Sequence, residues 1–206
     1  MGLMPKRFNA SKRRVGLSWA FGIVFGAGIF FTEGKWEGFP VVATVLYAIG
    51  IFLASIASLG RLWCMLYIAG RKQKVLVDQG PYSICRHPLY FFSFLGAAGV
   101  GLATETFLWP LVIVFFFSLY YPSVIRREEE KLSAIFGETF NAYRQTTPCF
   151  WPRWARLVEP DEYMVRPRIF RHHLFDALWF IWIVGIMEVI NGLHQTGIIP
   201  ILFRVW

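Results

Sequence analysis

Four long stretches of this chain contain no charged residue, and this feature restricts its fold more than any other. They cover residues 15–31, 39–59, 89–104 and 106–125 of the 206. A helix of about 20 apolar residues crosses the hydrocarbon core of a bilayer, so each stretch predicts a transmembrane helix. We predict a fifth span at 174–193, a stretch that Asp176 and Glu188 interrupt.

These spans predict an all-α integral membrane bundle of about five transmembrane helices, with residues 1–206 as a single domain. Glu105 alone separates the third and fourth stretches, so we expect those two helices to form a tight hairpin. The proline-rich segment 146–168 cannot form long helices, and we predict that it is an irregular cap. We expect the apolar tail, 197–206, at the opposite surface.

A periodic pattern of apolar residues follows the fourth stretch. Its members recur at spacings of four, four and three, which is typical of one face of a helix: Leu132, Phe136, Phe140 and Tyr143. We predict one amphipathic helix that continues from the fourth span and lies along the membrane interface.

The distribution of basic residues predicts the orientation in the membrane. The net charge is +8, and lysine and arginine are concentrated before the first span and after the second and fourth spans. This is the positive-inside pattern, so we expect a cytosolic N-terminus that is an uncleaved anchor, and membrane lipids, not nucleic acid, as partners. The membrane is then the bacterial inner membrane or, in a eukaryote, the endoplasmic reticulum.

Two polar clusters each adjoin the end of a span on this predicted cytosolic side. The first, residues 80–90, brings Tyr82, Arg86, His87 and Tyr90 next to the start of a helix, where free backbone N–H groups are available to a ligand. The second is the charged run 126–132. Taken alone, this second run is better explained as the solvated start of a helix than as a functional site.

Three other patterns have structural explanations. The glycine-rich run 96–101 lies inside a predicted span, where small residues allow close helix packing. His172, His173 and His194 lack partners at metal-ligand spacing, so we predict no metal site. The three cysteines are widely spaced and form no disulfide framework.

Together, the two clusters resemble the signature of the isoprenylcysteine carboxyl methyltransferase and phospholipid methyltransferase families. The first matching motif is Gly-Pro-Tyr-x3-Arg-His-Pro-x-Tyr at 80–90, and the second is Glu-Glu-x2-Leu-x3-Phe-Gly-x5-Tyr at 128–143. The likeness covers residues 71–153. It implies an S-adenosylmethionine-dependent enzyme without a Rossmann domain, with S-adenosylhomocysteine as product.

The resemblance also implies site residues. It assigns cofactor contacts to Lys74, Val75, Leu76, Val77, Tyr82, His87, Pro88, Leu89, Tyr90 and Glu128. In isoprenylcysteine methyltransferases a substrate-binding arginine occurs four positions before this glutamate, where the present chain has Val124. Arg126 or Arg127 is the candidate replacement, because a guanidinium matches a carboxylate with two parallel hydrogen bonds. The alternative is that both arginines are anchors at the membrane interface.

The predicted function is methylation of a lipophilic acceptor at the membrane interface. The favoured reaction, implied by the resemblance, is O-methylation of a carboxylate like that of the isoprenylcysteine carboxyl methyltransferases. O-methylation of a carboxylate needs no general base, whereas an amine acceptor must lose a proton, for which His87 or Glu128 is the candidate. The alternatives are a phospholipid N-methyltransferase and a non-catalytic membrane protein that retains the fold.

Overall fold

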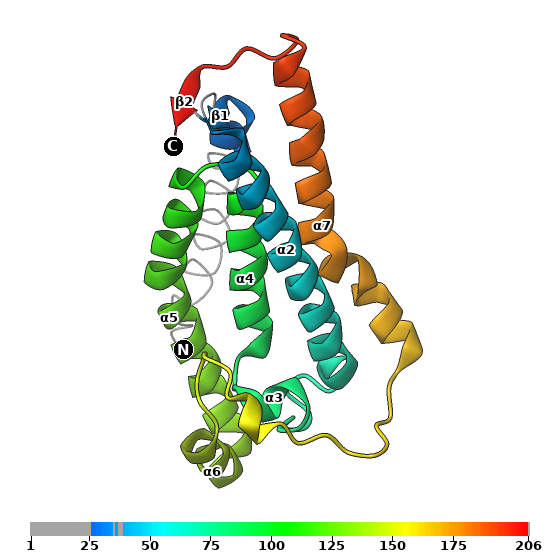
Figure 1. The fold of residues 1–206 in the computed structure, drawn as a ribbon. Helices are drawn as coiled ribbons and strands as arrows, with labels where there is room; N and C mark the ends of the chain where they lie inside the picture. The colour runs from blue at the N-terminus through cyan, green and yellow to red at the C-terminus, as the bar shows by residue number, and fades with distance from the viewer. Residues whose placement is uncertain (1–25, 35, 37–38, 206) are drawn as a thin grey trace, which may run out of the picture.

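The computed structural model describes residues 26–34, 36 and 39–205. Long helices form a bundle with a small two-stranded sheet at one end and short helices at the other (Figure 1). Residues 15–25 of the predicted first span, 15–31, lie outside the described residues, and 26–30 are helical.

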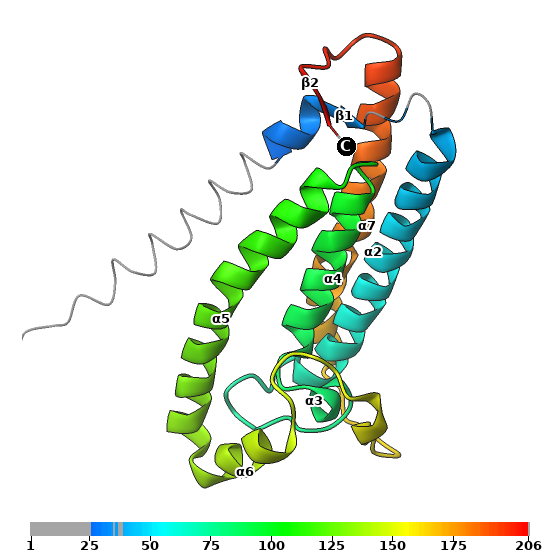
Figure 2. The same cartoon turned by 60° about the vertical axis from the view of Figure 1, so that its left-hand side comes forward.

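The long helices are α2 (Pro40–Ile68), α4 (Pro88–Leu102), α5 (Leu108–Phe136) and α7 (Pro167–Gln195). The short elements are α3 (Pro81–Ile84), α6 (Glu138–Thr146), the 3₁₀ helix η1 (Trp154–Arg156), β1 (Thr32–Gly34) and β2 (Phe203–Val205). We call the end of the bundle that carries α3, α6 and η1 the site end (Figures 1 and 2).

Three of the described helices, α2, α5 and α7, are long and apolar enough to cross a membrane, and α4 is a shorter apolar helix. The predicted all-α membrane fold is therefore confirmed, and the chain is an integral membrane protein. α5 has 29 residues, more than the roughly 20 that span a bilayer. Its last turns therefore extend beyond the apolar stretch, and they carry the second polar cluster.

Small residues bring α2 and α4 into close contact. A Cβ atom on Gly50 would lie 2.7 Å from the carbonyl oxygen of Gly99, and a Cβ on Gly99 would lie 2.8 Å from that of Gly50. These separations are too short for any side chain. The glycine-rich run 96–101 is thus part of a helix-packing surface, as predicted.

The predicted continuous amphipathic helix is wrong in one respect. The chain breaks at Gly137, whose φ of 52° is a conformation that favours glycine, and α5 and α6 are separate helices on either side of it. Phe140 and Tyr143 of α6 are buried. The break turns α6 back toward the cap (Figure 2), so this apolar face is covered by protein.

The C-terminal tail lies at the end opposite the site, as predicted. Its strand β2 pairs in parallel with β1. Next to the sheet, the turn between α4 and α5 includes Glu105, whose φ is 58° and whose carbonyl accepts a hydrogen bond of 2.5 Å from Trp36 Nε1.

Candidate active site

The first polar cluster forms a tight turn between α2 and α4. Gly80 has a φ of 56°, and a Cβ atom there would lie 2.3 Å from the ring of Tyr67, so no larger residue fits. Pro81 then begins α3 and Pro88 begins α4, positions where the missing N–H of proline costs nothing. The turn therefore places His87 directly before the first residue of α4.

A second segment, 147–158, holds this turn in place through backbone hydrogen bonds. The N–H of Arg86 donates to Pro148 O at 2.8 Å, and that of Arg153 donates to Ile84 O at 2.9 Å. The N–H of Gly80 donates to Val158 O at 2.8 Å. The predicted irregular cap is thus an ordered part of the site.

A pocket opens at the site end between the turn that follows α2, the start of α4 and the extension of α5. Its lining combines a mainly apolar wall with polar side chains: Ile68, Lys72, Gln73, Val75, Leu76, Val77, Tyr82, Arg86, His87, Leu89, Tyr90, Glu128, Lys131, Leu132, Phe136 and Tyr143. The two polar clusters, forty residues apart in the chain, therefore meet at one pocket.

Eight of the ten residues to which the resemblance assigns cofactor contacts line this pocket: Val75, Leu76, Val77, Tyr82, His87, Leu89, Tyr90 and Glu128. The other two do not. Lys74 is exposed, and its neighbours Lys72 and Gln73 lie at the pocket instead. Pro88 is fully buried as the first residue of α4, so its role is to start the helix.

The structure places Arg126 and Arg127 outside the pocket. Both are exposed, and Arg126 pairs with Glu130 at 3.5 Å across the outer face of α5. For Arg126 the reason is helical phase, because side chains that share a face recur every three or four residues. Glu128, Lys131 and Leu132 share the pocket face, whereas Arg126 lies on the face of Glu130. Arg127 lies one turn before Lys131, beside the pocket face, and is not part of the pocket lining.

Polar atoms of three side chains converge at the pocket. Tyr90 donates a hydrogen bond of 2.6 Å to Glu128 Oε2, and His87 Nδ1 lies 4.0 Å from the same oxygen. The rings of His87 and Tyr90 stack, with their centroids 5.7 Å apart. Glu128 thus presents a carboxylate, oriented by Tyr90, to whatever occupies the pocket.

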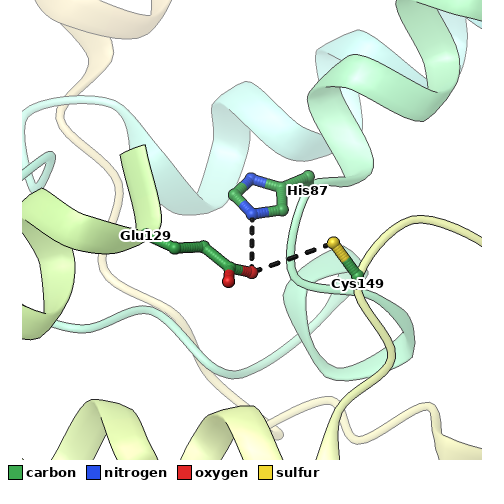
Figure 3. Close-up of side chains that lie close together, drawn as sticks. All are labelled: His87, Glu129 and Cys149. Carbon is green, nitrogen blue, oxygen red and sulfur yellow. Dashed lines mark hydrogen bonds and ion pairs between the residues drawn. The ribbon is translucent and has the colours of Figure 1, made fainter. Parts of the chain in front are cut away.

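Glu129 lies about 100° further round α5 and forms a buried cluster of its own. Its Oε1 accepts hydrogen bonds from Arg86 Nε at 2.8 Å and Cys149 Sγ at 3.8 Å, and lies 3.2 Å from His87 Nε2 (Figure 3). Arg144 Nε is 3.5 Å from Oε2. We call these five residues the Glu129 cluster.

His87, Glu129 and Cys149 are close enough to suggest a metal site, since their ligand atoms lie within 4.8 Å of one another. Two features oppose a cation there. Two arginines already pair with the carboxylate. Burial and the negative charge of Glu129 also raise the pKa of the Cys149 thiol, whereas a metal binds the thiolate. The arrangement suits hydrogen bonds that hold His87.

Two buried tyrosines close the pocket floor. Tyr143 donates a hydrogen bond of 2.7 Å to the carbonyl of Tyr82, and burial raises the pKa of both phenols. The Tyr82 hydroxyl is buried and has no hydrogen-bond partner among the residues that the structure describes. Because an unpaired buried polar group is costly, this hydroxyl is available to a ligand.

Sequence reasoning did not assign a role to Arg86, Glu129, Arg144 or Cys149. Arg86 and Glu129 belong to the two recognised motifs, so membership of a motif could have identified them as site residues. The family resemblance selected Glu128 for the cofactor, but the sequence could not show that Glu129 faces His87. Arg144 and Cys149 reach the cluster only because α6 and the cap fold back onto the turn.

Comparison with known proteins gives a consistent family assignment. The model of the phospholipid methyltransferase family matches residues 39–139. The chain is 36% identical over 190 residues to the cobalt-zinc-cadmium resistance protein CzcN of Cupriavidus metallidurans, covering 92% of this chain and 87% of the relative. It is 39% identical over 162 residues to the nickel-cobalt-cadmium resistance protein NccN of Alcaligenes xylosoxydans xylosoxydans, covering 79% and 74%.

A shorter match concerns an enzyme. The protein-S-isoprenylcysteine O-methyltransferase of Schizosaccharomyces pombe is 36% identical over 81 residues, covering 37% of this chain and 33% of the enzyme. No solved structure matches the chain. The family match spans α2, α4 and α5 and both polar clusters of the pocket. The family model and this enzyme match together support a membrane methyltransferase. The chain belongs to the phospholipid methyltransferase family.

Proposed function

We propose that this protein transfers a methyl group from S-adenosylmethionine to a lipophilic acceptor at the membrane surface. One observation carries the proposal: both polar clusters meet at a single pocket at the end of an apolar bundle. A soluble cofactor reaches such a pocket from water, while a lipid acceptor approaches from the bilayer. We place the site end on the cytosolic side, because the basic residues gather there.

The pocket has the polar and apolar groups that this cofactor requires. The Glu128 carboxylate and the unpartnered Tyr82 hydroxyl offer hydrogen bonds to the ammonium and hydroxyl groups of the cofactor. Val75, Leu76 and Val77 form an apolar wall beside them, suited to the adenine ring. His87, held by Glu129, also lines the pocket.

The chemistry favours a carboxylate as the acceptor. S-adenosylmethionine supplies a methyl group on a cationic sulfur, and in-line attack leaves a neutral thioether. When the attacking group is an anion, opposite charges cancel, which a pocket of low polarity favours. The residues of the chain then need only orient the reactants and exclude water.

An amine acceptor, such as a phospholipid head group, is the second candidate, and the matched family model favours it. An ammonium must lose a proton before it attacks. His87 Nδ1 and Glu128 are the groups at the pocket that could accept this proton. Methylation of an amine should therefore lose rate at low pH, whereas methylation of a carboxylate should lose rate only as the acceptor itself becomes protonated.

The names of the two long relatives suggest a biological setting. Both are resistance proteins, one for cobalt, zinc and cadmium and the other for nickel, cobalt and cadmium. We infer that methyl transfer by this protein contributes to tolerance of such divalent cations. If so, His87→Ala should fail to restore growth on zinc or cobalt in a deletion strain, although the variant is produced at wild-type levels.

Calorimetry with S-adenosylhomocysteine tests the proposal against a non-catalytic protein with the same fold. Wild type should bind, and Glu128→Gln should bind about tenfold more weakly, because a hydrogen bond to a charged group contributes about 1.5–3 kcal/mol. Arg126→Ala is the matched control on the outer face of α5 and should bind like wild type. Absence of binding by wild type, or unchanged binding by Glu128→Gln, would contradict the proposal.

The acceptor is identified in a second step. Purified protein is incubated with methyl-labelled cofactor and a total lipid extract, and the labelled products are separated. We expect label in the lipid fraction, as base-labile esters for a carboxylate acceptor and as base-stable amines for an amine acceptor. Label confined to water-soluble products would refute the lipophilic acceptor.

A further inference from the structure

Arg61 is a charged residue inside a helix that is otherwise suited to span a membrane. It lies seven residues before the end of α2 at Ile68, which is about 10 Å along the helix axis at a rise of about 1.5 Å per residue. A charge at this depth is expensive and often marks a functional site. It lies outside the active-site pocket, whose lining does not include it.

The guanidinium is held inward by neighbouring helices. Its Nη1 donates a hydrogen bond of 2.5 Å to Ser93 Oγ on α4, and its Nη2 donates one of 3.3 Å to the carbonyl of Asp176 on α7. The ring of Phe180 lies 5.6 Å from the guanidinium carbon. These contacts fix the group at one place between α2, α4 and α7.

Two features show that the charge is not satisfied within the protein. The Nε atom is buried without a hydrogen-bond partner, and no ion pair in the described part of the chain includes Arg61. The Asp176 carboxylate, which pairs with His173 at 3.1 Å, acts on Arg61 electrostatically but forms no ion pair with it. Because a partly buried cation without an anion in direct contact is unfavourable, an external anion would stabilise it.

Arg61 faces a cavity that is open on the outside of the bundle. Four aromatic residues of α7 form its walls: Phe175, Trp179, Phe180 and Trp182. Asp176 also lines the cavity. Phe175, Trp179 and Trp182 are exposed large apolar side chains. Tryptophan is enriched at the level of lipid head groups. A ligand for this cavity therefore combines an anionic group with an apolar body.

We propose that the cavity binds an anionic phospholipid, with the phosphate on the Arg61 guanidinium and the acyl chains along Trp179 and Trp182. Each terminal nitrogen of a guanidinium carries a second N–H, so the group can hold phosphate oxygens in addition to its contacts within the protein, in a planar geometry that a lysine ammonium cannot reproduce. The lipid would contact both α2 and α7. It would thereby hold the C-terminal helix against α2, α4 and α5, the helices that the family model matches. This role is independent of methyl transfer.

Native mass spectrometry of the full-length protein tests the proposal. The protein is reconstituted with phosphatidylcholine containing phosphatidylglycerol, extracted in mild detergent, and the retained lipids are counted. Wild type should retain one phosphatidylglycerol that Arg61→Met loses. Arg61→Lys keeps the positive charge and is a control for misfolding of Arg61→Met. It should retain the lipid about tenfold less well than wild type, because the two-point contact of the guanidinium is lost. Arg126→Met, an exposed arginine at the same end, is the matched control.

Equal retention by wild type and both Arg61 variants would overturn the proposal, as would equal retention of phosphatidylcholine and phosphatidylglycerol by wild type. A second arm adds inorganic phosphate to detergent-solubilised protein and measures the melting temperature. We expect no increase, because free phosphate makes no contact with the aromatic walls. An increase equal to that caused by phosphatidylglycerol would assign the site to a soluble anion and refute the lipid.

Discussion

The two ends of the bundle use the same kind of ion pair at very different depths. At the site end, Glu129 and Arg86 are 2.8 Å apart, and each side chain is only 10% exposed. At the opposite end, Glu33 and Arg204 are 3.4 Å apart across the β1–β2 sheet, and the arginine is half exposed. Water therefore screens the second pair and is largely excluded from the first.

This difference indicates what each pair does. Burying charges costs free energy that the pair repays only with good geometry and additional hydrogen bonds, and the Glu129 cluster provides both. Its residues come from the turn before α4, from α5, from α6 and from the cap, so the cluster joins four segments around His87. The exposed pair joins the middle residues of two short strands and contributes little.

The largest expected effect is that of Glu129→Ala. The substitution leaves Arg86 buried without its carboxylate, and breaking a buried pair costs about 3–5 kcal/mol. The free energy of unfolding in mixed micelles should fall by about this amount, and binding of S-adenosylhomocysteine should be lost because His87 is released. Glu130→Ala, the exposed neighbour that pairs with Arg126, is the control and should change neither quantity appreciably. Wild-type stability of Glu129→Ala would show that the cluster is not structural.

A smaller effect, with a defined pH dependence, is expected at Glu105. Burial, with the negative charges of Glu188 and Glu33, raises the pKa of this carboxyl above its ordinary value of 4.5. The folded chain thus holds the proton more tightly than the unfolded chain, and Glu105 destabilises the fold increasingly as pH rises from about 4.5 through the folded pKa. Glu105→Gln should be more stable than wild type at pH 8, with the difference shrinking toward pH 4. A difference that does not change with pH would contradict this account.

The smallest effect is expected for Arg204→Ala. Exposed ion pairs contribute about 0–1 kcal/mol, and salt screens them. The melting temperature should therefore change little at low ionic strength and not at all at high salt. A loss of stability as large as that of Glu129→Ala would remove the proposed contrast between the two ends.

Sequence patterns predicted the membrane class well, because the charge-free stretches are long and the positions of charged residues follow simple solvation rules. They predicted helix bounds less well. The helix predicted at 174–193 begins at Pro167, since its first turns are polar and lie before the apolar part. The predicted single amphipathic helix is two helices, because Gly137 takes a positive φ that apolar periodicity does not reveal.

The sequence by itself determined that the chain is a helical membrane protein and that two motifs adjoin its spans. Both conclusions follow from local composition and spacing, which need no knowledge of packing. Only the tertiary structure decided that Glu129 holds His87, and that Arg126 and Arg127 lie outside the pocket. Those outcomes depend on the rotation of α5 about its axis relative to α4 and on the cap folding over the turn at Gly80. Contacts between segments far apart in the chain determine both the rotation of α5 and the position of the cap.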